Sequence, residues 1–106
     1  MIESPENSLT LCPPFMEREL TVLNKLGLHA RPAAEFVRCA RGFKNTEVFI
    51  RKGGEEYSAA SILELLSANL DCGAQMTLIA DGNEAAKALD ALSALMEQFR
   101  EQEEED

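Results

Sequence analysis

The chain contains one histidine, His29, and its neighbours are of types that suit the handling of a phosphoryl group. Gly27 allows unusual backbone angles just before the histidine, and Pro32 favours a first helical turn just after it. This spacing predicts His29 at or next to a helix N-cap, where free N–H groups and the helix dipole favour an anion and disfavour imidazolium. A neutral imidazole is a nucleophile, so the residues predict a phosphorylatable histidine, with a plain helix start as the alternative.

Two further side chains are candidates for phosphate chemistry. Arg31 lies two residues after the histidine, and its guanidinium suits phosphate oxygens. Ser61 precedes an apolar segment, and Glu64 follows three residues later, which is the spacing of a helix capping box. The cap alone explains Ser61, so phosphorylation of this serine is one of two interpretations.

The elements that position these residues follow from the spacing of the apolar side chains. Alternation predicts half-buried strands, and apolar residues at intervals of three and four predict helices. The predicted strands cover residues 18–23, 46–51, 56–59 and 75–80, and the predicted helices cover residues 30–41, 61–69 and 85–100. The order β-α-β-β-α-β-α predicts an α+β fold in which helices cover one face of a single sheet.

The charge is unevenly distributed along the 106 residues. The formal net charge of −9 excludes a typical nucleic-acid-binding protein, which needs clustered positive charge. Most of the acidic excess lies in residues 1–16 and 101–106, whereas residues 25–52 hold seven basic and two acidic side chains. The segment around His29 is therefore locally basic and suits an anion.

Length and composition predict one globular domain with short extensions. We expect a flexible N-terminal arm over residues 1–16, a folded domain over residues 17–100 and an acidic C-terminal tail over residues 101–106. The three cysteines form no CxxC or CxxH pair, so we expect no metal site. No export signal and no long apolar run is visible, which predicts a cytoplasmic protein.

The string Asn-Lys-Leu-Gly-Leu-His-Ala-Arg-Pro-Ala-Ala at residues 24–34 resembles the active-site signature of the HPr family. HPr is the histidine-containing phosphocarrier protein of the phosphoenolpyruvate-dependent phosphotransferase system. The resemblance extends over about residues 17–100 and includes the glycine hairpin at residues 53–54. It implies an HPr-like open-faced β-sandwich, a four-stranded antiparallel sheet with three helices on one face.

The resemblance implies a transfer intermediate and not an enzyme with its own small-molecule substrate. His29 would accept the phosphoryl group from enzyme I on Nδ1 and pass it to an EIIA-type protein or domain. Arg31 would close on the phosphoryl group, and N–H groups around Ala30 and Arg31 would bind it. Leu28, Ala30 and Pro32 would shape the site, and Pro32 would belong to the phosphate-binding segment with Ala30 and Arg31. No cofactor is implied, and we expect a monomer that binds neither nucleic acid nor membrane.

Ser61 resembles the regulatory serine that HPr kinase/phosphorylase phosphorylates in many members of the family. A phosphate there would lie at a helix N-terminus, which tolerates it electrostatically. The added negative charge would then repel an acidic partner surface and block docking.

The family docks its partners through apolar residues beside the active-site helix. Those residues here are Leu28, Ile62, Leu63 and Leu66, and a place in the core is the alternative for each. Basic residues are expected to ring the site and steer acidic partners, with a solvated surface as the alternative. They are Lys25, Arg31, Arg38, Arg41, Lys44, Arg51 and Lys52.

Alternatives for the function stay open. Asn-Lys-Leu-Gly before the histidine is similar to NPr, the nitrogen-related member of the family, whereas Ser-Ile-Leu at residues 61–63 suits a kinase-regulated HPr. A different class of function is a regulatory module that binds a transcriptional regulator or a kinase, with phosphorylation only as a signal. A structural adaptor is a third class, which would make the string at residues 24–34 a coincidence. The intact His29 favours transfer over both.

Overall fold

The computed structural model describes residues 15–105 of the chain, with side chains as far as Gln102. The elements in this range are β2 (Phe15–Thr21), α1 (Ala30–Arg41), β3 (Thr46–Lys52), β4 (Glu55–Ser58), α2 (Ile62–Ser67), β5 (Gln75–Gly82) and α3 (Ala85–Glu105). No helix within residues 15–105 has both the length and the apolar character that crossing a membrane requires.

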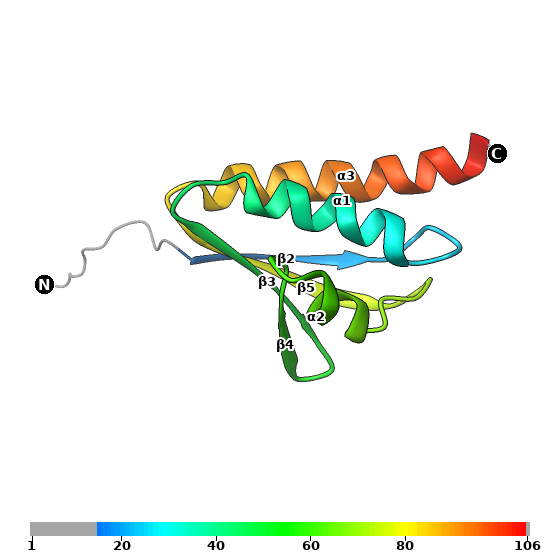
Figure 1. Ribbon diagram of the computed structural model, residues 1–106, viewed down its shortest axis with the longest axis horizontal. Coiled ribbons are helices and arrows are strands. Elements are labelled where there is room, and N and C mark those ends of the chain that lie inside the picture. The colour runs from blue at the N-terminus through cyan, green and yellow to red at the C-terminus, as the bar shows by residue number, and fades with distance from the viewer. Residues whose placement is uncertain (1–14, 106) are drawn as a thin grey trace, which may run out of the picture.

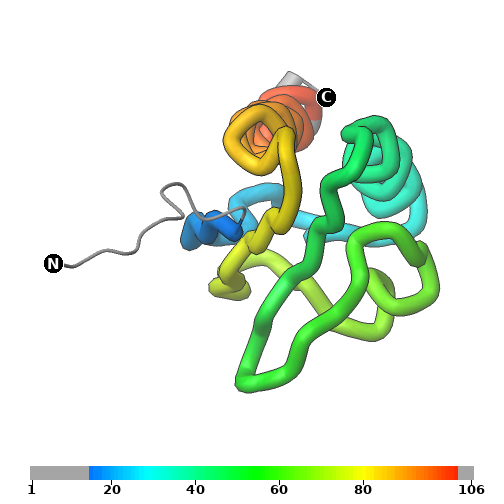
Figure 2. The backbone as a smooth tube through the Cα atoms, turned by 90° about the vertical axis from the view of Figure 1, so that its left-hand side faces the viewer, coloured from blue at the N-terminus to red at the C-terminus, as the bar shows by residue number. Residues whose placement is uncertain are grey.

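The strands form one antiparallel sheet in the order β2-β5-β3-β4. Its register places Leu20 opposite Met76 and Ile50 opposite Leu78. Figures 1 and 2 show α1 and α3 side by side across one face of the sheet, and α2 packs against α1 and β4. The expected α+β open-faced sandwich is confirmed.

The core lies between the sheet and the helices because alternate strand residues point to that face. Its largest fully buried apolar side chains are Phe36, Ile50, Leu65, Leu78, Leu89, Leu92 and Val22. On α1 the buried residues are those of the predicted apolar stripe, Ala33, Phe36, Val37 and Ala40, together with Pro32. These buried side chains pack α1 against the sheet, and the start of the helix remains exposed at the surface.

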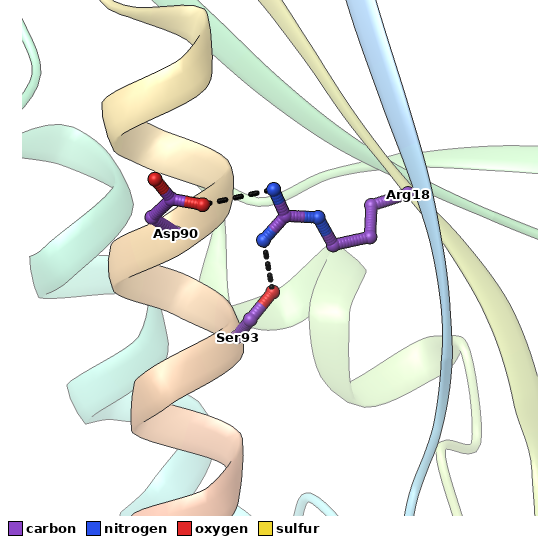
Figure 3. Close-up of polar contacts among 3 residues, drawn as sticks. All are labelled: Arg18, Asp90 and Ser93. Atoms are coloured by element: carbon purple, nitrogen blue, oxygen red, sulfur yellow. Dashed lines mark hydrogen bonds and ion pairs between the residues drawn. The ribbon is translucent and has the colours of Figure 1, made fainter.

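A polar contact joins the edge strand β2 to α3 (Figure 3). The Arg18 guanidinium donates from Nη2 to Asp90 Oδ1 over 2.8 Å and from Nη1 to Ser93 Oγ over 3.1 Å. Arg18 therefore points to the helical side of the sheet, and its strand neighbours at odd positions point to the open side.

Both ends of the domain differ from the sequence-based expectation. Residues 1–14 of the expected arm lie outside the described residues, but Phe15 and Met16 belong to β2. At the other end, α3 continues to Glu105 instead of ending at Arg100. Glu and Gln are good helix formers, so this run extends the helix for as far as the structure describes it.

Candidate functional site

The loop of residues 22–29 joins β2 to α1 and is held against the loop between α2 and β5. Val22 N donates to Ala74 O over 2.9 Å, and Leu28 N donates to Leu70 O over 2.8 Å. These two bonds lie near the ends of the loop. They therefore fix where the chain enters α1.

Within this loop, Asn24 and Gly27 are bonded to each other. The buried Asn24 side chain donates from Nδ2 to Gly27 O over 2.6 Å, and Gly27 N donates to Asn24 O over 3.0 Å. Asn24 Oδ1 accepts no hydrogen bond from the described residues. Gly27 has a φ of +68°, and a Cβ atom there would lie 2.5 Å from Leu70 O. The turn before the helix thus requires glycine both for its backbone angle and for space.

His29 is the N-cap of α1, as the sequence predicts. Its carbonyl accepts the Ala33 N–H over 2.9 Å, while its exposed side chain makes no capping hydrogen bond. The first N–H groups of a helix have no intrahelical partner, so those of Ala30 and Arg31 are available to an anion. The imidazole therefore lies beside a small anion-binding helix terminus.

His29 and Arg31 line the same open surface pocket, which has a volume of about 430 Å³. The other lining residues are Asn24 and Leu26 of the loop, Pro32 and Glu35 of α1, and Phe99 and Gln102 of α3. Among residues 15–102, whose side chains the structure describes, neither the His29 imidazole nor the Arg31 guanidinium has a hydrogen-bond or ion-pair partner. A nucleophilic ring and a cation are thus available together at one helix terminus.

Comparison with known proteins decides the family. The family model described as "PTS HPr component phosphorylation site" matches residues 16–98. This chain belongs to the HPr family of phosphocarrier proteins. The family match ends at residue 98, whereas α3 of this HPr-family chain continues to Glu105.

Named relatives within the HPr family cover the same part of the chain. HPr-like protein Crh of Halalkalibacterium halodurans is 42% identical over 78% of this chain and 98% of that protein. Phosphocarrier protein NPr of Shewanella violacea is 43% identical over 77% of this chain and 89% of that protein. The crystal structure of HPr-C-His from Thermoanaerobacter tengcongensis aligns with a TM-score of 0.75 and 34% identity, over 79% of this chain and 93% of that chain.

The pocket of this HPr-family domain includes residues that sequence reasoning missed. In the sequence, Phe99 is the last residue of an apolar stripe. That pattern predicts its burial but does not predict that it lines the pocket of His29. Gln102 gave no signal, because the helix was expected to end two residues earlier, at Arg100. Both residues reach the pocket because α3 packs beside α1.

Leu28 is one of the residues predicted for the docking surface of the HPr fold. Its side chain is only 5% exposed and belongs to the hydrophobic core. The backbone bond from Leu28 to Leu70 holds the loop against its neighbour, with the leucine side chain beneath it. This burial favours a place in the core over the predicted contact of Leu28 with a partner.

The residues expected on α2 lie at the surface. Leu63 is 77% exposed and Ile62 is 36% exposed, whereas Leu66 is partly buried and packs against the core. The fully buried anchor of this helix is Leu65. A second surface pocket, of about 440 Å³, joins Ile62 to α1 and is lined by Ala34, Val37, Arg38, Arg41 and Gly42.

Ser61 is the N-cap of α2 and forms part of the predicted capping box. Its Oγ accepts the Glu64 N–H over 3.3 Å. The Glu64 carboxylate accepts the Ser58 N–H over 2.9 Å instead of returning to Ser61. The two side chains therefore cap two backbone N–H groups: Ser61 Oγ caps that of Glu64, and the Glu64 carboxylate caps that of Ser58.

Two of the basic residues expected around His29 have other partners. Arg51 forms ion pairs with Glu17 over 3.1 Å and with Glu56 over 3.7 Å. Lys52 Nζ donates to the carbonyls of Ala68 and Asn69. β3 directs Arg51 to the open side of the sheet and Lys52 to the end of α2, and the expectation that they ring the site stays a prediction.

Cys39 is the other candidate nucleophile on α1. Desolvation by burial raises the pKa of its thiol. The thiol therefore stays protonated at neutral pH, and the thiolate is the reactive form. His29 is the better nucleophile of this helix.

Proposed function

We propose that this chain is a phosphocarrier of the phosphotransferase system in which His29 carries the phosphoryl group. It accepts the group from phospho-enzyme I and passes it to an EIIA-type protein, as a monomer in the cytoplasm. The observation that carries this proposal is the shared pocket of His29 and Arg31 at the N-terminus of α1. The chain serves as a transfer intermediate and uses no cofactor.

In the proposed transfer, Nδ1 of the neutral His29 ring attacks the phosphorus of the phosphoryl group on enzyme I. A bond forms between Nδ1 and phosphorus while the bond between phosphorus and the donor atom of enzyme I breaks. The donor atom of enzyme I leaves with the electron pair of that bond. The proton on Nε2 is lost to solvent, and the departing donor takes one up, so the charges balance. Delivery to an EIIA-type protein repeats the step with His29 as the leaving group.

The surroundings of His29 suit the charged product. The N–H groups of Ala30 and Arg31 and the positive end of the α1 dipole favour the phosphoryl oxygens. The Arg31 guanidinium adds a charge-assisted hydrogen bond. Pro32 has no N–H to offer, and its buried ring fixes the backbone of the first turn.

The proposed docking face combines α2 and α1. Ile62 and Leu63 supply exposed apolar area, with Leu66 partly exposed beside them. Arg38 and Arg41 line the adjoining pocket and add positive charge. This surface suits a partner with an apolar centre and an acidic rim.

Incubation of the chain with enzyme I and phosphoenolpyruvate is expected to add one phosphoryl group. Intact-mass measurement detects the addition, and acid treatment is expected to remove it because a nitrogen–phosphorus bond is acid-labile. A reaction without enzyme I is the control. A group that survives acid would place the phosphate on an oxygen and contradict the proposal.

The acceptor is identified by the second half of the transfer. Purified EIIA proteins of the sugar and nitrogen branches are added separately to the phosphorylated chain. The cognate protein is expected to discharge it faster, because complementary docking raises the rate of productive encounter. Failure of every EIIA protein to discharge the chain would favour a regulatory module over a carrier.

We also propose that Ser61 is a regulatory phosphorylation site for HPr kinase/phosphorylase. Its hydroxyl is partly exposed and lies next to Ile62 of the proposed docking face. A phosphate would have to displace the Glu64 N–H contact and would lie close to the Glu64 carboxylate. The modification would thus add negative charge where an acidic partner is expected to dock.

Kinase and ATP are expected to place one acid-stable phosphate on the wild-type chain and none on Ser61→Ala. Ser67→Ala, on the same short helix, is the matched control and should be phosphorylated like the wild type. Because loss of the cap costs about 1 kcal/mol, thermal unfolding must show that Ser61→Ala is folded. No acid-stable phosphate on the wild type would contradict the regulatory proposal.

A further inference from the structure

The last turns of α3 lie beyond residue 98, where the match to the HPr family model ends. Phe99 is 5% exposed and anchors this segment in the core. Figure 1 shows that α1 starts and α3 ends on the same side of the molecule. The segment after residue 98 therefore brings Phe99 and Gln102 into the pocket of His29.

Gln102, the polar residue of this segment that lines the pocket, is chemically distinct from its neighbours. Residues 101–106 read EQEEED, so Gln102 is the single uncharged residue of an acidic run. Unlike the carboxylate of Glu35, which also lines the pocket, a carboxamide has two N–H donors to offer to a phosphoryl group. The single uncharged residue of this acidic run is therefore the one that lines the same pocket as His29.

Two other polar side chains of the pocket, Asn24 and Glu35, do not offer a hydrogen-bond donor to an incoming anion. Asn24 is buried and uses Nδ2 to bind Gly27 O, so it is not accessible to an incoming group, and Glu35 is an acceptor only. Among residues 15–102, whose side chains the structure describes, the Gln102 carboxamide has no hydrogen-bond partner. His29, Arg31 and Gln102 are therefore the pocket side chains with a donor or nucleophile free for an incoming group.

We infer that Gln102 is a phosphoryl-binding residue that α3 adds to the site. It donates a hydrogen bond to an oxygen of the phosphoryl group on the side of the pocket opposite α1. The inference rests on the proposed function of His29 and extends it to a residue outside the family match.

The test uses inorganic phosphate as the probe, so that it does not depend on enzyme I. The amide signals of Ala30 and Arg31 are followed by NMR as phosphate is added, and they give a dissociation constant. Gln102→Ala is expected to weaken binding about tenfold, the effect of one lost hydrogen bond to a charged group. Gln102→Glu should weaken it further, because it adds a like charge.

Gln98 supplies the matched control, since it is exposed on the same helix one turn earlier and does not line the pocket. Gln98→Ala and Gln98→Glu should leave the dissociation constant within about twofold of the wild type. Equal weakening by the Gln98 and Gln102 variants, no effect of either, or no binding of phosphate by the wild type would each overturn the inference. Phosphorylation of the wild type by enzyme I tests the carrier function separately, so the two failures are distinguishable.

Discussion

Replacement of His29 by alanine is expected to abolish phosphoryl transfer from enzyme I, with a loss of about 10³-fold or more. The reaction needs a nitrogen lone pair at the start of α1, and the alanine variant retains the anion-binding N–H groups without a nucleophile. Intact-mass measurement after incubation with enzyme I and phosphoenolpyruvate gives the phosphorylated fraction.

The fold should survive this change. The His29 side chain is exposed and caps no backbone group, so its removal should alter the free energy of unfolding by no more than about 0.5 kcal/mol. Urea unfolding of both proteins is the control. A folded alanine variant that still acquires an acid-labile phosphoryl group would exclude His29 as the acceptor.

Gly27→Ala is expected to have the largest effect on stability that bears on the site. Its positive φ costs an alanine about 1–3 kcal/mol, and the overlap of Cβ with Leu70 O and Asp71 Cα adds about 1–3 kcal/mol. The loop can accept the methyl group only by moving away from Leu70, and that movement shifts Leu28 and the N-cap. We therefore expect a free energy of unfolding lower by about 2–6 kcal/mol, together with slower phosphorylation.

Gly53→Ala separates the two contributions. Gly53 also has a positive φ, +60°, but a Cβ atom there would have no neighbour within 4 Å. This variant should lose about 1 kcal/mol and keep the wild-type rate of phosphorylation. Equal destabilisation by the two substitutions would show that the contact with Leu70 is unimportant.

The fold was predictable because each element has a local signal. The stripe on α1 and the alternation on β5 are read from neighbouring residues, and they give burial directly. The position of His29 was predictable for the same reason, since a glycine, a proline and a helical period surround it. These features need no knowledge of the rest of the chain.

What could not be predicted depends on contacts between distant segments. The burial of Leu28 follows from a backbone bond to Leu70, and the partners of Lys52 lie at the end of α2. Gln102 lines the pocket of His29 because α3 continues beyond its apolar stripe and packs beside α1. An acidic run of helix-forming residues is ambiguous between a helix and a tail until its packing is known.

The central claim is that His29 Nδ1 carries the phosphoryl group. Phosphorus–proton correlation NMR of the chain, after phosphorylation by enzyme I, locates the phosphorus atom directly. We expect one phosphorus signal, correlated with the ring protons of His29 in the pattern of an Nδ1 substituent and lost on acidification. A signal correlated with any other residue, or the absence of a signal with active enzyme I, would contradict the claim.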